Sequence, residues 1–254
     1  MALSKETKSN KFNKTHGAVT DEGSALRRYQ QVIVGSESLL RTIYFEFCTW
    51  LAIVPGAAGL LLRKLFWPRM FGHCGKGVQF AAGIILRHPS RISLGDNVVL
   101  SEGVVLDARN EQVDIALSIG SDSMLSNQVI INCKGGTVAI GESAGIGAQT
   151  VIQSTNDCPV ELGNDVIVGP RCYLVGGGSY NIDDLDTPIR LQGIKQDQGC
   201  KLADNIWIGA NVTVLGNAHI KSGAVVAACA LVNDTVEENS VVVGVPAKLI
   251  KKRQ

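Results

Sequence analysis

Aromatic residues and histidines are scarce in this sequence. Phe, Trp and Tyr make up 5% of the 254 residues, and there are four histidines, at positions 16, 73, 88 and 219. A large core therefore has to be built from aliphatic side chains. The histidines are also widely separated, whereas a zinc site needs three or four ligands close together. We therefore expect no metal.

Excess charge, paired cysteines and an N-terminal apolar run are lacking as well. The chain has 24 basic and 23 acidic residues, so its bulk charge implies no nucleic-acid partner. The seven cysteines contain no CxxC pair, and an odd, unpatterned set is typical of reduced thiols. The first thirty residues are polar and contain no apolar signal-peptide segment. We therefore expect a cytoplasmic protein.

Aliphatic residues, by contrast, are abundant and recur at every sixth position. A helix would repeat every 3.6 residues and a strand every 2, so neither explains this period. The repeats form four sets of three and one unbroken set of six: Leu94, Leu100 and Leu106; Ile119, Leu125 and Ile131; Ile140, Ile146 and Ile152; Leu162, Val168 and Leu174; and Leu202, Ile208, Val214, Ile220, Val226 and Val232.

This period predicts a solenoid of short parallel strands, in which three hexapeptides make one triangular coil. Each coil buries its aliphatic side chains by stacking on the next. Six coils spaced by about 4.8 Å predict a prism about 29 Å long. Every insertion follows the third aliphatic residue of a coil, so all insertions should leave the prism at the same edge. The longest adds 22 residues, between about Gly176 and Lys201.

The pattern resembles the hexapeptide-repeat acyltransferase family. The segment LADNIWIGANVTVL, the run to VVVGVPAKLI and a loop of the form GGG…DxxxPI carry the resemblance. It implies an all-β fold, a left-handed parallel β-helix over residues 75–250, after a disordered tail at 1–23 and a helical segment at 24–74. The implied activity is transfer of an acetyl or other acyl group from coenzyme A to a hydroxyl or amine. The implied acceptor is a sugar in polysaccharide or glycolipid assembly.

The segment at 24–74 has three possible roles. Residues 24 to about 53 are expected to form a helix that breaks near Pro55-Gly56. Residues 43–62 carry one charged side chain, Glu46, and basic residues follow them. A cap on the first coil, an anchor in the surface of a membrane and a membrane span all remain open.

The long loop departs from the family pattern at one position. The resemblance implies a catalytic histidine in a pattern such as His-x-Phe-x-Asp-x-x-x-Pro-Ile. With Pro188-Ile189 fixing the register, Tyr180 occupies the histidine position. A phenol, with an ordinary pKa of about 10, is a poorer base at neutral pH than an imidazole, at about 6.5. We therefore expect Tyr180 to position the substrate, and Asp183 or His219 to act as the base.

The resemblance also implies where the donor, acetyl-CoA, binds. Its pantetheine arm is expected along the C-terminal coils, where small residues allow close approach to the backbone. Lysines near the C-terminus suit its phosphates. A homotrimer is implied, with the donor site between neighbouring prisms. The expected contacts are Trp207, Gly209, Ala227, Ala228, Lys248, Lys251 and Lys252.

Other functions are weighed against this one. The missing histidine leaves open a catalytically degenerate β-helix that acts as a scaffold or binding module. A zinc-dependent carbonic anhydrase on the same kind of helix is excluded by the dispersed histidines. A nucleotide-binding βαβ domain is excluded because Gly176-Gly177-Gly178 does not open such a unit.

Overall fold

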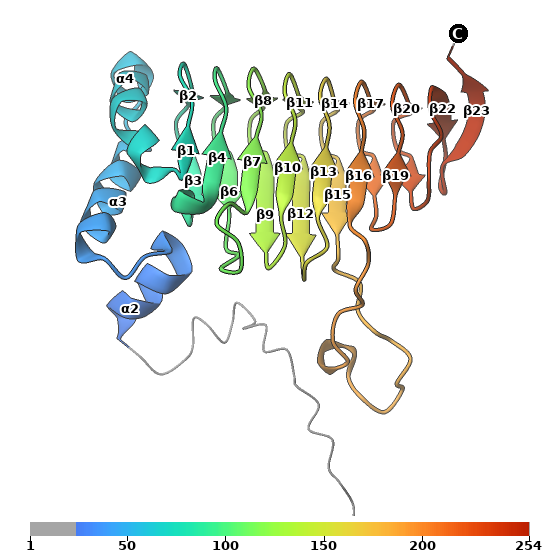
Figure 1. The fold of residues 1–254 in the computed structure, drawn as a ribbon, viewed down its shortest axis with the longest axis horizontal. Coiled ribbons are helices and arrows are strands. Elements are labelled where there is room, and N and C mark those ends of the chain that lie inside the picture. The colour runs from blue at the N-terminus through green and yellow to red at the C-terminus, as the bar shows by residue number, and fades with distance from the viewer. Residues whose placement is uncertain (1–23, 254) are drawn as a thin grey trace, which may run out of the picture.

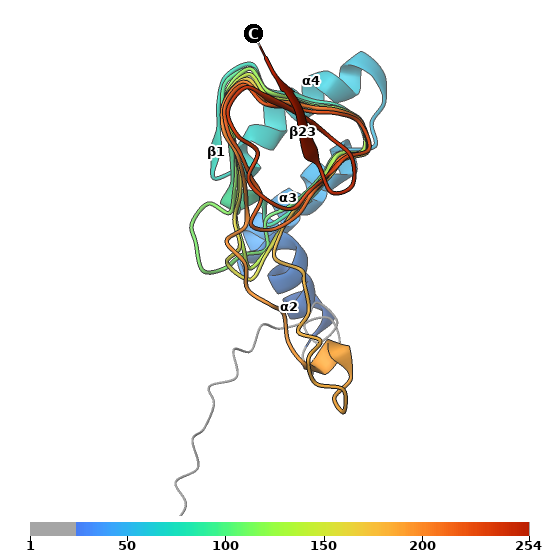
Figure 2. The ribbon, with the colours of Figure 1, turned by 90° about the vertical axis from the view of Figure 1, so that its right-hand side faces the viewer.

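The computed structural model describes residues 24–253, and the predicted disordered tail at 1–23 lies outside this range. Its main body is a parallel β-helix with three sheets as the faces of a triangular prism (Figures 1 and 2). The predicted fold class, including the N-terminal helical segment and the long loop, is confirmed. One face, sheet A, contains β1 (His73–Cys74), β4 (Ile92–Leu94), β7 (Leu117–Ile119), β10 (Val138–Ile140), β13 (Val160–Leu162), β16 (Cys200–Leu202) and β19 (His219–Ile220).

The other two faces follow in the same order along each coil. Sheet B contains β2 (Gln79–Phe80), β5 (Val99–Leu100), β8 (Met124–Leu125), β11 (Gly145–Ile146), β14 (Ile167–Val168), β17 (Trp207–Ile208), β20 (Val225–Val226), β22 (Ser240–Val243) and β23 (Lys248–Lys252). Sheet C contains β3 (Ile85–Arg87), β6 (Val105–Asp107), β9 (Ile130–Lys134), β12 (Val151–Thr155), β15 (Tyr173–Gly176), β18 (Thr213–Val214) and β21 (Leu231–Val232).

The aliphatic residues of the six-residue period fill the inside of the prism, as predicted. Leu100, Ile131 and Val214, one from each of three coils, have no exposed surface. Each strand places one residue inward and its neighbours outward, so a strand of two or three residues is enough to seal one face. The turns between sheets A and B place a left-handed residue at the same point of successive coils, with φ between 54° and 59° at Asn97, Asp122, Ser143, Asp165 and Asn205.

The number of coils was underestimated from the sequence. The strands form seven complete coils, and β22 begins a further turn. The missed coil is the first, where Cys74, Phe80 and Leu86 pair with Leu94, Leu100 and Leu106 of the next coil. Cysteine and phenylalanine hid this coil from a search for aliphatic residues.

All the insertions leave the prism between sheets C and A, as predicted. They follow β6, β9, β12 and β15, and the longest connects β15 to β16. Viewed along the prism, the connections after β6 and β15 bulge out on the same side of the triangle (Figure 2). The prism therefore offers one edge on which loop residues and residues of sheet A lie close together.

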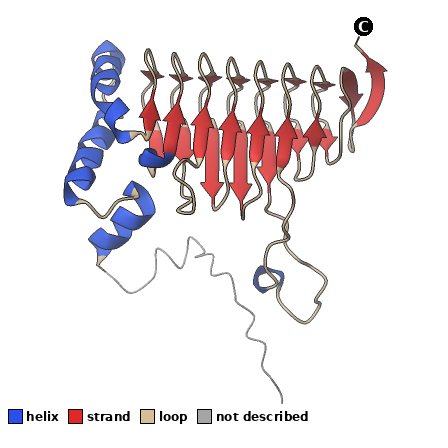
Figure 3. Cartoon of the chain, in the orientation of Figure 1, coloured by secondary structure: helices blue, strands red, loops and turns tan. Residues whose placement is uncertain are grey.

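The single helix predicted from residue 24 to about 53 is wrong, because the chain turns at Gly35. This glycine has a φ of 74°, which ends the preceding π-helical turn, and Ser38 caps the next helix. The segment contains α2 (Ala25–Tyr29), the π-helical turn η1 (Gln30–Val34), α3 (Leu39–Leu51), α4 (Gly56–Phe66) and the 3-10 turn η2 (Trp67–Met70) (Figure 3). Two further 3-10 turns, η3 (Pro89–Arg91) and η4 (Ile189–Leu191), lie in connections of the β-helix.

The helical segment lies against the open edge of the first coil. Arg63 of α4 is buried and donates hydrogen bonds to the carbonyl oxygens of Phe80, Leu51 and Val54 at 2.9, 2.9 and 2.8 Å. The amide of Gly83 donates to the carbonyl of Ala52. Polar backbone groups of the first coil, which has no preceding coil to pair with, thus find partners in the helices. No helix within residues 24–253 is long and apolar enough to cross a membrane.

The C-terminal basic run is a strand rather than a solvated tail. β23 pairs antiparallel with β22 and lies at the far end of the prism from the helices (Figures 1 and 2). All five side chains of β23 are exposed. Its lysines are therefore held on a fixed backbone at the end of sheet B.

Candidate active site

The long loop between β15 and β16 is tied to the prism by a narrow neck. The amide of Lys195 donates to the carbonyl of Ser179 at 2.7 Å, and the amide of Asn181 donates to the carbonyl of Gly193 at 3.0 Å. Tyr180 and Ile194 face each other across this neck in an antiparallel bridge. The position of Tyr180 is therefore set by backbone hydrogen bonds on both sides of it.

Beyond the neck, the amide side chain of Gln192 holds the loop together. Its nitrogen donates to the carbonyl oxygens of Asp184 and Thr187 at 2.6 and 2.7 Å, and its oxygen accepts from the amide of Asp184 at 3.1 Å. The carboxylate of Asp184 accepts from the amides of Thr187 and Asp186, and the Thr187 side chain contributes most to lowering the pKa of Asp184. A glutamine in a polar loop gives no sequence signal of such a role.

Asp197 closes the base of the loop. Its carboxylate accepts from the amide of Gly177 at 3.0 Å and from the amide of Gly199 at 2.7 Å. Both glycines are buried, so their N–H groups have no water to replace these bonds. Gly216 of the next coil lies so close that a Cβ there would be 2.0 Å from a carboxylate oxygen of Asp197. Asp197 was not identified from the sequence.

The proposed catalytic residues differ in how they are held. Tyr180 is 47% exposed, and Asp183 is exposed in the outer part of the loop. His219 is half-buried on β19 and pairs in register with Lys201 of β16. Within residues 24–253 no hydrogen bond joins Tyr180, Asp183 and His219 to one another, so a single chain does not assemble them into one hydrogen-bonded group.

His219 is nevertheless close to the point where the loop returns to the prism. Asn217, two residues before it, accepts from the amide of Gln198 at 2.9 Å and donates its own amide to the carbonyl of Gly199. On the other side, Lys201 forms an ion pair with Glu161 at 2.9 Å. The outer surface of sheet A thus presents a carboxylate, an ammonium and an imidazole on three successive coils.

Among the remaining histidines and cysteines, Cys158 lies at this edge, where its Sγ atom accepts from the amide of Asp197 at 3.4 Å. His88 is buried, with its Nε2 atom 2.8 Å from the carbonyl oxygen of Gln31, and burial lowers its pKa. Burial also raises the pKa of the Cys133 and Cys200 thiols to about 12, which makes them poor nucleophiles at neutral pH. Across residues 24–253, no three histidine, cysteine, aspartate or glutamate side chains gather in a way that could hold a metal ion.

The expected donor contacts separate into two groups. Trp207, Lys251 and Lys252 line an open groove at the C-terminal end of sheet B, together with Ile167, Val225, Val241 and Arg253. This groove combines an apolar floor with three cationic side chains and one carboxylate, that of Asp165. Lys248 pairs with Val243 at the other end of β23 and does not line the groove.

The second group is the turn between sheets B and C. A Cβ on Gly209 would lie 2.5 Å from the amide nitrogen of Ala228 and 3.0 Å from the carbonyl carbon of Ala227. The lack of a side chain at position 209 is therefore already required for the stacking of one coil on the next. The presence of a glycine at position 209 is therefore no evidence for a bound ligand.

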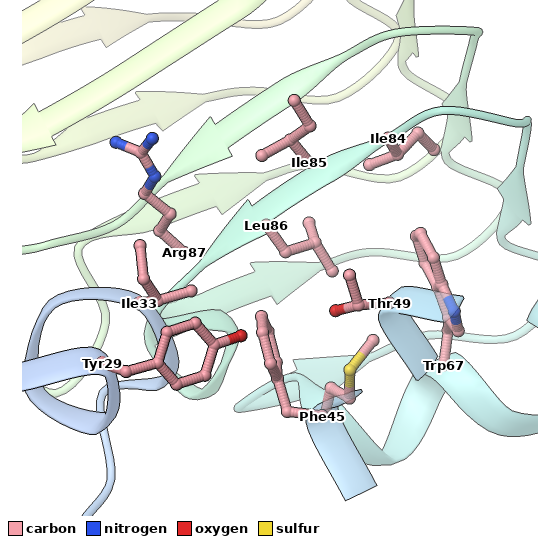
Figure 4. A pocket seen from close by; sticks show the side chains of 10 residues that line it. Tyr29, Ile33, Phe45, Thr49, Trp67, Ile84, Ile85, Leu86 and Arg87 are labelled. Carbon is pink, nitrogen blue, oxygen red and sulfur yellow. The ribbon is translucent and has the colours of Figure 1, made fainter. Parts of the chain in front are cut away.

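A further hollow lies between the N-terminal helices and the first coil (Figure 4). Its walls are mostly apolar and include Phe45, Trp67 and Leu86, while Tyr29 and Arg87 supply polar groups. It contains none of the candidate catalytic residues. We therefore place the candidate active site at the loop edge, and the candidate donor site in the groove of sheet B.

Comparisons with known proteins agree with this architecture. The chain is 31% identical over 169 residues to the "Probable acetyltransferase Rv3034c" of Mycobacterium tuberculosis, covering 66% of this chain but 54% of that protein. It is 28% identical over 194 residues to the "Putative lipopolysaccharide biosynthesis O-acetyl transferase WbbJ" of Escherichia coli, covering 76% of this chain and 86% of that protein. The chain thus spans about half of the first relative and most of the second. No protein-family model matches the chain.

A solved structure shows the same fold. A mutant of AntD, an N-acyltransferase from Bacillus cereus in complex with dTDP and coenzyme A, superposes with a TM-score of 0.52 and 20% identity, covering 72% of this chain and 85% of AntD. The named relatives are acetyltransferases, and none of this supports the alternative of a non-catalytic scaffold.

Proposed function

We propose that this chain, a hexapeptide-repeat protein related to acetyltransferases, transfers an acetyl or other acyl group from coenzyme A to a hydroxyl or amine of a sugar. The observation that carries the proposal is the similarity to WbbJ, which extends over most of both proteins. The groove of sheet B and the loop edge supply the two sites that such a reaction needs.

The reaction needs one proton to be moved. As the acceptor oxygen attacks the thioester carbonyl, a base removes the hydroxyl proton; the carbon–sulfur bond then breaks, and the sulfur leaving group takes up a proton. We propose His219 as this base, because an imidazole titrates near neutral pH and β19 holds it on the rigid prism. Asp183 is the alternative, although an exposed carboxylate is a weak base. Tyr180 positions the acceptor through its hydroxyl group.

The groove at Trp207 suits the donor. The indole is 57% exposed on the outer surface of sheet B, beside Ile167 and Val225. We propose that the pantetheine arm lies along this apolar floor and continues past the turn at Gly209, Ala227 and Ala228. In this arrangement Lys251, Lys252 and Arg253 lie near the phosphates of coenzyme A. Lys248 adds positive charge for the same phosphates from outside the groove. The coenzyme A bound to AntD belongs to that protein and motivates the choice of donor.

A homotrimer is the assembly that we propose. A closed ring of three identical subunits requires two different contact surfaces on each subunit. The outer rows of sheets B and C are both largely apolar, while that of sheet A is largely polar. On sheet B the row is Gln79, Val99, Met124, Gly145, Ile167, Trp207, Val225 and Val241; on sheet A it is His73, Ser93, Ser118, Ala139, Glu161, Lys201 and His219. On sheet C it is Ile85, Val105, Ile130, Val151, Tyr173, Thr213 and Leu231, beside a shorter polar row of Arg87, Asn132 and Gln153.

The trimer also accounts for the separation of the candidate catalytic residues. The loop projects away from the prism that carries it (Figure 1), and Tyr180 makes no hydrogen bond with His219 of the same chain. We propose that the loop of one subunit reaches the prism of the next, so that the site is composite. Light scattering at micromolar concentration tests this directly, since a stable monomer contradicts a composite site.

We further propose that the protein works in the cytoplasm, where acyl-CoA is available to it, and that residues 43–62 associate with a membrane surface. The seven cysteines are unpaired, as expected for a reducing compartment. The surface that makes the membrane contact is developed below.

Four single variants test the catalytic assignment: His219→Ala, Asp183→Asn, Tyr180→Phe and Tyr180→His. Loss of the general base should lower the rate of acyl transfer by about 10²–10⁴-fold. We expect this loss in His219→Ala and a smaller one in Tyr180→Phe, while Asp183→Asn stays close to the wild type. Tyr180→His should raise the rate, because it places an imidazole where relatives of this family are expected to have one. Unchanged rates in His219→Ala, Asp183→Asn and Tyr180→Phe would show that the site lies elsewhere.

A further inference from the structure

The outer face of α3 and α4 carries many exposed apolar side chains, of which Phe47 also packs edge-on against the ring of Phe66. The inner face of α3 buries Phe45, Cys48 and Leu51 against neighbouring elements. The exposed side of α3 also carries large apolar side chains, although Arg41, Glu46 and Thr49 are exposed there as well. The exposed side chains of this face are Leu39, Leu40, Ile43, Phe47 and Trp50 of α3, Ile53, and Leu60, Leu61 and Leu65 of α4.

We propose that this face docks the chain onto the surface of an anionic lipid bilayer. It gives the membrane association proposed above a defined surface and orientation, and it is testable by binding alone. The apolar run at 43–62 is neither a continuous span nor only a cap: its inward residues cover the first coil, while its outward residues are free to enter a bilayer. α3 and α4 are about 20 and 17 Å long, too short for the ~30 Å hydrocarbon core, and suit a position in the interface.

The charges of the segment fit an anionic surface. Residues 24–74 carry six arginines and lysines and two glutamates, although the whole chain has 24 basic and 23 acidic residues. The helical end of the molecule thus carries a net positive charge, and β23 at the opposite end is basic as well, with Lys248, Lys251 and Lys252. Arg41, Lys64 and Arg69 are exposed on or beside the two helices, while the carboxylate of Glu46 accepts a hydrogen bond from the hydroxyl of Tyr29. Basic residues beside an apolar face strengthen binding to anionic lipids.

The position of the helices fixes the orientation. They lie at the N-terminal end of the prism, and β17, β20, β22 and β23, which carry residues of the groove of sheet B, lie near the opposite end (Figure 1). Docking through α3 and α4 would therefore stand the prism on the membrane. Trp207 lies on the sixth coil, so five coil spacings and part of a helix diameter separate it from Trp50. This places Trp207 roughly 30 Å farther from the membrane than Trp50. In a ring of three subunits the three helical faces lie in one plane, so all of them meet the same bilayer together.

The two exposed tryptophans report on this orientation. Trp50 is 67% exposed on the docking face, and Trp207 is 57% exposed on sheet B, while Trp67 is buried. Vesicles of phosphatidylcholine with phosphatidylglycerol, carrying brominated acyl chains, quench indoles that enter the bilayer. We expect Trp207→Phe to keep the quenching of the wild type and Trp50→Phe to lose it. Quenching that survives in Trp50→Phe and disappears in Trp207→Phe would overturn the orientation.

Sedimentation with the same lipids, without bromine, tests the surface itself. Leu40 and Leu61 are exposed, so the double variant L40E/L61E should fold like the wild type, as circular dichroism can verify. We expect its binding constant for the vesicles to be at least about tenfold lower than that of the wild type. The matched control is I182E/L185E, which adds the same charges to exposed positions of the long loop and should bind like the wild type.

Three results would overturn the proposal. The first is equal binding of L40E/L61E and the wild type. The second is an equal loss of binding in both double variants. The third is a combination of two observations: the wild type does not bind vesicles, and without lipid it forms an assembly that the L40E/L61E variant does not form. This result would mean that a second copy of the chain covers the face. None of these readouts depends on acyl transfer.

Discussion

Asp197 should control whether the long loop keeps its position on the prism. Its carboxylate accepts from the amides of Gly177 and Gly199, which are buried on either side of the loop. A hydrogen bond to a charged acceptor contributes about 1.5–3 kcal/mol, and Asp197→Ala removes two of them. Since part of this loss is relieved when the loop relaxes, we expect local opening of the loop base to become easier by about 3 kcal/mol.

Hydrogen exchange measures this opening. A change of 3 kcal/mol corresponds to exchange about 150-fold faster at Gly177 and Gly199, while amides of the inner strands keep their protection. Asp197→Asn keeps an acceptor oxygen without the charge and should lie between Ala and the wild type. Gly216→Ala is an independent route to the same effect, because its Cβ would occupy the position of the Asp197 carboxylate. Asp186→Ala, which removes an exposed loop carboxylate, is the control. Wild-type exchange at both glycines in Asp197→Ala would refute this reasoning.

Three further changes test the fold around the site. Arg63→Met removes three hydrogen bonds to buried carbonyl oxygens and should cost about 3 kcal/mol in the free energy of unfolding, whereas the exposed neighbour Lys64→Met should cost nearly nothing; chemical denaturation compares them. Gly209→Ala should lower the stability by about 2 kcal/mol because its Cβ meets the next coil, but Gly145→Ala, where a Cβ meets nothing within 4 Å, should be neutral by thermal melting. Burial lowers the pKa of His88 in the folded state, so the unfolded state binds a proton first as the pH falls. This contribution to the free energy of unfolding should be complete above about pH 6.5 and be lost as the pH falls below it, and His88→Gln should lack this part of the loss.

The period of six was sufficient to predict the β-helix, because an inward aliphatic residue is required once in every strand of every coil. It located the insertions at one edge for the same reason. It missed the first coil, where Phe80 and Cys74 fill the interior in place of aliphatic residues. The break of the N-terminal helix at Gly35 was missed although the sequence marks it, with a glycine followed by a polar run that ends in the capping residue Ser38.

The site was harder to predict than the fold. Tyr180 was located by its distance from Pro188-Ile189, but the hydrogen bonds that hold its loop come from Asp197, Gln192 and Asn217. Asp197 and Asn217 bond to backbone amides 20 and 19 residues away, and Gln192 bonds within a largely irregular loop, so no sequence pattern marks them. The apolar surface on α3 and α4 could not be separated from the core-facing side either, because large apolar side chains lie on both sides of α3.

The central claim is acyl transfer, and the most direct measurement follows the acyl group itself. Wild-type protein is incubated with acetyl-CoA labelled in the acetyl group and a panel of sugar acceptors, with His219→Ala in parallel. Mass spectrometry then records the label in the sugar. The account predicts a labelled, acetylated sugar that forms only when protein, donor and acceptor are all present, and far more slowly with His219→Ala. Absence of a labelled sugar across the panel, with acetyl-CoA left intact, would contradict it.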